Sequence, residues 1–162
     1  MLGEGHADIV ERHLISHKKD RILHVGPSSN PVTNKNVASL VDEVICGDLK
    51  IPTINLVKRK IPRIVPVAMD LFQMPFREDT FDLVLAIGIP QLYERPVEGL
   101  IEFKRVNAKG GKLIVCNRDG GNNVCFDQYK RMVDEVGYRI LEESIGIDSE
   151  ERTNRYLLVL QK

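Results

Sequence analysis

Residues 63–112 constrain the fold of this chain more than any other part of its sequence. Two apolar runs, at residues 64–68 and 81–87, have the length and the β-branched content of buried strands. Asp70 follows the first run, and Pro96 stands where a helix would begin after the second. Strand, acidic turn, strand and helix in this order are typical of an α/β fold with a parallel sheet.

The rest of the chain continues this alternation. Strand-like runs at residues 22–26, 43–46 and 113–116 and helical patterns at 4–18 and 126–136 surround the central stretch. In the helix after Pro96, Val97, Leu100 and Ile101 share a predicted face, and Gly110 is the predicted stop. Two last runs, 138–147 and 156–160, are joined by a polar turn, so they should be antiparallel neighbours. The predicted fold is α/β and Rossmann-like: a doubly wound, seven-stranded, mostly parallel sheet with a C-terminal antiparallel hairpin and helices on both faces.

Composition narrows the class of protein. With 162 residues, 43% hydrophobic content and no repeat or linker, we expect one domain spanning residues 1–162. A formal net charge of zero gives no basic surface for a phosphate backbone, so a small-molecule or protein partner is favoured over nucleic acid. Cys46 and Cys116 fall in apolar runs, which indicates buried thiols in a reducing compartment. No apolar run is long enough for a membrane span, so we expect a cytoplasmic protein without a membrane partner.

Several residues of the central stretch carry a family resemblance. They are Phe76, Phe81, Asp82, Arg105, Val106, Gly110 and Gly111. Together they resemble the second half of a class I S-adenosylmethionine-dependent methyltransferase core, of the methyltransferase type 11-like kind. That resemblance implies a seven-stranded sheet, S-adenosyl-L-methionine as cofactor and transfer of its methyl group to an acceptor.

The first glycine motif of that family is degenerate here. Gly26 keeps the first glycine position, while Ser28 and Asn30 occupy the next two and His24 stands where an acidic residue is common. Asparagine adopts a positive φ more readily than most residues, so it is tolerated there. The same spacing argues against a dinucleotide-dependent oxidoreductase, because Pro31 would occupy the third position of G-x-G-x-x-G.

Ligands of such sheets bind beyond the carboxyl ends of the strands. By the resemblance, Asp48 would accept the ribose hydroxyls and Asp70 the adenine amino group, while Leu71 would offer its backbone N–H and its side chain to the adenine ring. The alternative is that both aspartates are turn or capping residues chosen for local hydrogen bonds. The complete predicted cofactor set is His24, Gly26, Pro27, Ser28, Asp48, Leu49, Asp70, Leu71 and Ile87.

Two functions follow from these residues. The first is an S-adenosylmethionine-dependent methyltransferase that acts on an unidentified acceptor, without a metal and without an assigned catalytic base. His24 could act as a base only if its ring faces the pocket. The second is a non-catalytic protein of the same fold that acts as a binding or regulatory partner, which the degenerate glycine motif favours.

Overall fold

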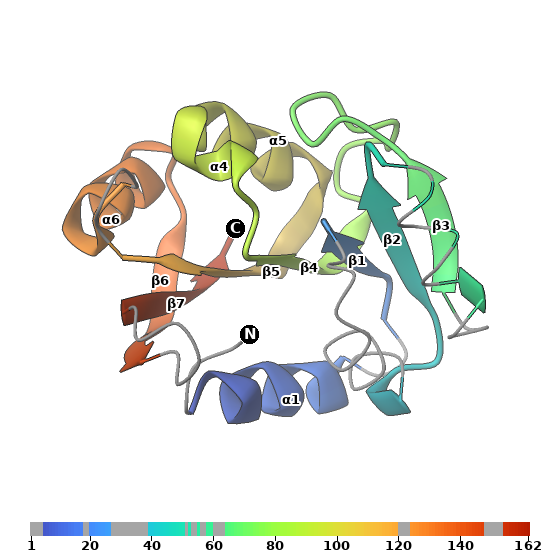
Figure 1. The fold of residues 1–162 in the computed structure, drawn as a ribbon, viewed down its shortest axis with the longest axis horizontal. Helices are drawn as coiled ribbons and strands as arrows, with labels where there is room; N and C mark the ends of the chain where they lie inside the picture. The colour runs from blue at the N-terminus through green and yellow to red at the C-terminus, as the bar shows by residue number, and fades with distance from the viewer. Residues whose placement is uncertain are drawn as a thin grey trace.

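A computed structural model describes residues 5–17, 20–26, 39–50, 52, 55, 58–59, 64–119, 124–147 and 154–162. Within these ranges, seven strands form one sheet in the order β3-β2-β1-β4-β5-β7-β6 (Figure 1). The strands are β1 (Ile22–Val25), β2 (Val44–Asp48), β3 (Ile64–Ala68), β4 (Phe81–Ile87), β5 (Asn107–Arg118), β6 (Arg139–Ile147) and β7 (Asn154–Gln161). Strands β1 to β5 pair in parallel, and β7 is antiparallel to both β5 and β6. The predicted fold class is confirmed.

Helices cover both faces of this sheet. Helix α1 (His6–Ser16) packs on one face, and α4 (Gln91–Glu94), α5 (Pro96–Val106) and α6 (Phe126–Glu135) lie on the other (Figure 1). Each face has its own apolar cluster, with Leu14 of α1 in one and Phe103 of α5 in the other. The central strand β4 is buried almost throughout, as expected of a parallel strand covered on both sides.

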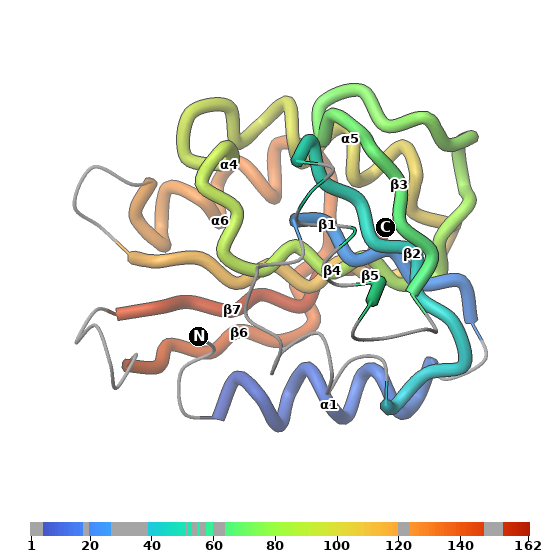
Figure 2. The backbone as a smooth tube through the Cα atoms, turned by 45° about the vertical axis from the view of Figure 1, so that its right-hand side comes forward, coloured from blue at the N-terminus to red at the C-terminus, as the bar shows by residue number. Residues whose placement is uncertain are grey.

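The C-terminal hairpin is tied to α1 as well as to the sheet. Figure 2 shows β6 and β7 running above α1, with β7 between β6 and β5. The Arg12 guanidinium on α1 donates to both carboxylate oxygens of Glu142 on β6, at 2.7 and 2.9 Å. This contact joins two segments from opposite ends of the chain.

The end of α5 differs from the prediction that Gly110 stops the helix. The helix ends at Val106, and β5 already begins at Asn107, whose backbone is extended. The buried Asn107 amide donates to the carbonyls of Phe81 and Lys112, at 3.0 and 3.1 Å. These bonds draw the chain onto β4, so Gly110 lies inside β5, where it has a φ of 75°.

The buried face of α5 also differs from the prediction. Ile101 is 55% exposed, whereas Leu100, Phe103 and Val106 are fully buried. Gly99 belongs to this buried face because the Leu92 side chain of α4 occupies the space beside its Cα. The helical spacing of three to four residues fits both the predicted face, with Ile101, and the observed face, with Gly99. The observed face is buried because α4 packs closely against Gly99.

Candidate functional site

The carboxyl ends of β1 and β4 lie side by side at the point where strand order reverses. In this sheet order β1 is followed in space by β4, while β2 and β3 extend to the other side. Both strands end in glycines with left-handed backbone: Gly26 has a φ of 63° and Gly88 a φ of 64°. A Cβ at Gly88 would meet no atom within 4 Å, so open space adjoins this turn. Such a reversal is where open α/β sheets bind ligands.

Asp48 and Asp70 lie at the same edge of the sheet, at the end of β2 and just after the end of β3. Asp48 is the last residue of β2 and pairs with Ala68 at the end of β3, two positions before Asp70. Asp48 Oδ1 accepts the Lys50 N–H at 2.8 Å, and Asp70 Oδ1 accepts the Phe72 N–H at 2.9 Å. Each carboxylate therefore shapes its own turn through one oxygen. Half-buried Asp48 and exposed Asp70 are both open to a ligand.

The other predicted residues lie in different surroundings. Leu49 is 62% exposed beside Asp48, and Ile87 is half-buried at the end of β4. The Leu71 side chain lies in the apolar core near Gly99, so only its backbone is left to face the edge. Pro27 and Ser28 lie outside the described residues.

His24 does not face the open edge of the sheet. It alternates with Leu23 and Val25, which belong to the cluster under α5, and so points to the α1 face, beside Cys46 and Leu85. Burial lowers the pKa of His24 to about 4. The ring is therefore neutral at pH 7 and lies away from the turns of Gly26 and Gly88, which does not suit a general base.

A charged pair on α5 holds the segment after Asp70. Glu102 is buried and accepts the Met74 N–H at 2.7 Å, and Arg105 donates to Glu102 at 2.6 and 2.7 Å. Arg105 also donates to the carbonyls of Phe76 and Met74, at 2.7 and 3.0 Å. The pair thus fixes residues 74–76 against the helix.

Two side chains fill the space against the glycines of this edge. A Cβ at Gly47 would overlap the Met69 side chain, and one at Gly26 would lie 3.2 Å from Ile89. Sequence reasoning missed both of these contacts and the role of Glu102. The three-residue spacing of Glu102 and Arg105 on a helix was the one available signal for the charged pair.

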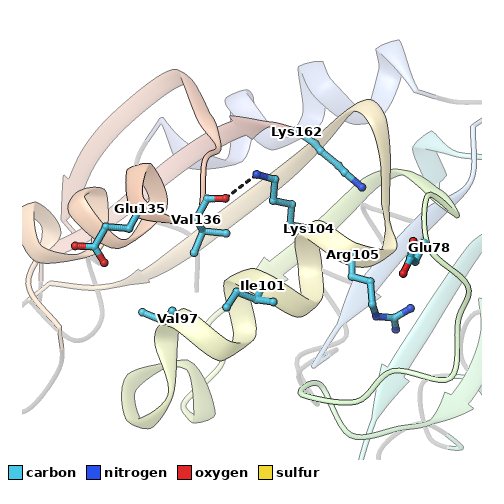
Figure 3. A pocket seen from close by; sticks show the side chains of 8 residues that line it. All are labelled: Glu78, Val97, Ile101, Lys104, Arg105, Glu135, Val136 and Lys162. Carbon is cyan, nitrogen blue, oxygen red and sulfur yellow. Dashed lines mark hydrogen bonds between the residues drawn. The ribbon is translucent and has the colours of Figure 1, made fainter.

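Two clefts among the described residues lie away from this edge. The larger, about 530 Å³, lies between α5 and α6 and is bordered by Ile101, Lys104 and Lys162 (Figure 3). The Lys104 ammonium donates to the Val136 carbonyl across it at 2.6 Å. The smaller, about 230 Å³, is lined by Ile22 and Phe81 at the amino ends of β1 and β4. Neither adjoins the pair of aspartates.

The described part of the chain contains no group of three or more His, Cys, Asp or Glu side chains placed to hold a metal ion. None of its helices is both long enough and apolar enough to cross a membrane.

Comparison with known proteins decides the family. The model of the methyltransferase domain matches residues 23–115, more than half of the chain and all of the edge described above. The chain belongs to the methyltransferase domain family. A demethylmenaquinone methyltransferase of Renibacterium salmoninarum is 32% identical over 100 residues, which cover 59% of this chain and 40% of that relative. This methyltransferase-domain chain therefore spans about two fifths of that relative's length.

Solved structures share the fold at low sequence identity. The N-methyltransferase NodS from Bradyrhizobium japonicum, in complex with S-adenosylhomocysteine, has a TM-score of 0.76 at 15% identity, covering 96% of this chain and 86% of NodS. The [4+2]-cyclase SpnF has a TM-score of 0.78 at 14% identity, covering 100% of this chain and 84% of SpnF. The predicted class I methyltransferase resemblance is confirmed at the level of family and fold.

Proposed function

We propose that this chain is an S-adenosylmethionine-dependent methyltransferase, folded as one methyltransferase-like domain over residues 1–162. The observation that carries the proposal is the position of Asp48 at the end of β2, opposite Ala68, with Asp70 two residues past the end of β3, at the edge that also holds the glycine turns after β1 and β4. Membership of the methyltransferase domain family supports it.

The chemistry of these residues fits the nucleoside part of S-adenosylmethionine. Each aspartate uses one oxygen for its own turn, and the remaining acceptor capacity suits the ribose hydroxyls and the adenine amino group. The open space beside Gly88 would accept the part of the cofactor that lies across β4. Exposed Leu49 adds an apolar surface next to Asp48 for the flat base.

The cofactor supplies a methyl group on a sulfonium, which is already activated for transfer. The protein then has to place an acceptor in line with that methyl group, and orientation alone can lower the barrier by several kcal/mol, up to about 7–11 in the best cases. Asp48 and Asp70 would set the position of the nucleoside, and the turn at Gly88 would allow close approach of the backbone. Neutral, buried His24 is not assigned a proton-transfer role.

The acceptor is proposed to be a small molecule or a protein rather than nucleic acid. A formal net charge of zero supports this preference, because phosphate-backbone binding rests on clustered basic residues. The relative named as a demethylmenaquinone methyltransferase supports a small-molecule acceptor.

A second candidate function is a binding or regulatory protein that keeps the fold without methyl transfer. The absence of glycine at positions 28 and 30 favours it. The likeness to SpnF, named as a cyclase, illustrates that the fold alone does not specify methyl transfer. Binding of S-adenosylhomocysteine without turnover of any acceptor would favour this candidate.

Calorimetric titration with S-adenosylhomocysteine tests the first proposal. Wild-type protein should bind, and Asp48→Asn or Asp70→Asn should weaken binding about 10- to 100-fold, since each removes a charge-assisted hydrogen bond. The matched control is Asp82→Asn, because Asp82 lies on β4 at the opposite edge and accepts the Arg21 N–H at 3.0 Å. An absence of binding heat, or an equal loss in the Asp82 variant, would contradict the proposal.

A further inference from the structure

A cluster of buried polar side chains lies between the sheet and helix α6. Asn117 of β5, Tyr129 of α6 and Tyr156 of β7 are almost completely buried. Both polar atoms of the Asn117 amide and the hydroxyl oxygens of both tyrosines have no hydrogen-bond partner in the described structure. Buried polar groups are nearly always paired, so several unpaired ones in one place call for an explanation.

These three residues are neighbours. Asn117 and Tyr156 face each other directly across the antiparallel pair β5–β7. The Tyr156 ring packs against Tyr129 and Phe126, with centroid distances of 5.4 and 5.2 Å. The cluster thus joins a polar amide and two hydroxyls to three aromatic rings that pack at tilted angles.

The cluster adjoins the proposed cofactor edge. Asn117 follows Cys116, which pairs with Ile87 at the end of β4. Its neighbour Arg118 donates its backbone N–H to the hydroxyl of Tyr93 on α4, at 3.1 Å. Helix α4 therefore covers the cluster from the side of the open turn at Gly88. It is only four residues long, with Leu92 as its one fully buried side chain, so little of the core must open to move it.

The chemistry of the cluster favours an uncharged ligand. Burial is the largest cause that raises the pKa of Tyr129 and of Tyr156, and the nearby Tyr93 raises both further. Both hydroxyls are therefore neutral at pH 7. A neutral oxygen that both donates and accepts hydrogen bonds could satisfy these groups, whereas an ion would carry a large desolvation cost.

We propose that Asn117, Tyr129 and Tyr156 form the inner wall of the methyl-acceptor site and bind a neutral hydroxyl or carbonyl group on an aromatic acceptor. This inference rests on the proposed function for its reaction, but its binding claim stands by itself. The acceptor's oxygen would reach the amide once the Tyr93 contact with Arg118 opens, and the rings of Phe126, Tyr129 and Tyr156 would face the flat part of the molecule.

Isosteric substitutions separate a binding role from a structural one. Asn117→Leu keeps the shape of the side chain but removes its unpaired polar atoms, and Tyr156→Phe removes only a hydroxyl. If these groups serve a ligand, both variants should keep or gain thermal stability, with Asn117→Leu gaining about 2–6 °C in Tm. Both should also bind naphthol, a neutral aromatic hydroxyl, at least about tenfold more weakly than wild type.

The matched control is Tyr138→Phe. The Tyr138 hydroxyl is likewise buried without a partner, but Tyr138 precedes β6, beside the Arg139–Gln161 end of the β6–β7 pair, whereas Tyr156 lies toward the opposite end of that pair. This variant should change stability in the same direction and leave the Kd of naphthol unchanged. Wild-type protein should bind naphthol and not naphthoate, its charged counterpart.

Both titrations are run with and without S-adenosylhomocysteine, so the two proposals fail separately. Loss of cofactor binding alone would overturn the proposed function, while weakened naphthol binding in the variants would still support the acceptor wall. Wild-type protein that does not bind naphthol would overturn the acceptor wall. Equal naphthol binding by wild type and Asn117→Leu would also overturn it, and would assign the cluster to internal water.

Discussion

Removing the charge of Glu102 at constant shape should be among the most destabilising single changes in this chain. Glu102→Gln weakens three hydrogen bonds: those from the Met74 N–H and from two nitrogens of Arg105, at 2.6 to 2.7 Å. Breaking a fully buried ion pair lowers the free energy of unfolding by about 3–5 kcal/mol, and losing one hydrogen bond to a charged group lowers it by about 1.5–3 kcal/mol. The Arg105 side chain is 31% exposed and keeps contact with water, so we expect about 2–4 kcal/mol.

For a domain of this size, that loss corresponds to a fall in Tm of about 5–15 °C, measured by circular dichroism and checked by urea unfolding. Hydrogen exchange adds a local readout, because the Met74 amide should exchange faster than in wild type. The control is Glu98→Gln, which disrupts an exposed pair with Arg95 on the same helix and should cost no more than about 1 kcal/mol. If the two variants were equally stable, the charged pair of Glu102 and Arg105 would not hold residues 74–76 as described.

Three further predictions concern single side chains. Burial lowers the pKa of His24 from 6.5 to about 4, so the unfolded chain takes up a proton first as pH falls. The free energy of unfolding should therefore be highest above pH 6.5 and fall by roughly 3 kcal/mol by pH 4. In urea unfolding, His24→Leu should show a shallower pH dependence than wild type. The added methyl group in Gly47→Ala would overlap the Met69 side chain, so thermal unfolding should show a loss of about 1–3 kcal/mol in stability. A double variant that also carries Met69→Ala should recover part of this loss. Full stability of Gly47→Ala would disprove the contact. Burial raises the pKa of Cys46 to about 12, so a thiol reagent should label half-buried Cys125 in the native protein and all three cysteines in urea, and rapid native labelling of Cys46 would contradict its burial.

The strands of this fold could be predicted because each buried strand is a short apolar run between breakers. The bounds of β3 and β4 agree with the prediction at both ends. The hairpin followed from two strand-like runs without a helix between them. The order of the strands in the sheet was not predicted, since local patterns carry no information on which strands pair.

The errors occurred where tertiary contacts override local signals. Gly110 is a plausible helix stop by its residue type, but the Asn107 amide ends α5 earlier by bonding to Phe81 and Lys112. Ile101 fitted one helical face, and the approach of Leu92 to Gly99 selected another. At the candidate site, Asp48 ends β2 opposite Ala68 and Asp70 follows two residues later, while the cofactor role of both stays a prediction. Local patterns did not reveal that His24 points to the α1 face.

A crystal structure with S-adenosylhomocysteine tests the central claim most directly. We predict the nucleoside at the carboxyl edge, with its ribose hydroxyls within hydrogen-bond distance of Asp48 and its adenine amino group at Asp70. Electron density for the ligand in the cleft between α5 and α6, or at the carboxyl edge without contact to either aspartate, would contradict the account.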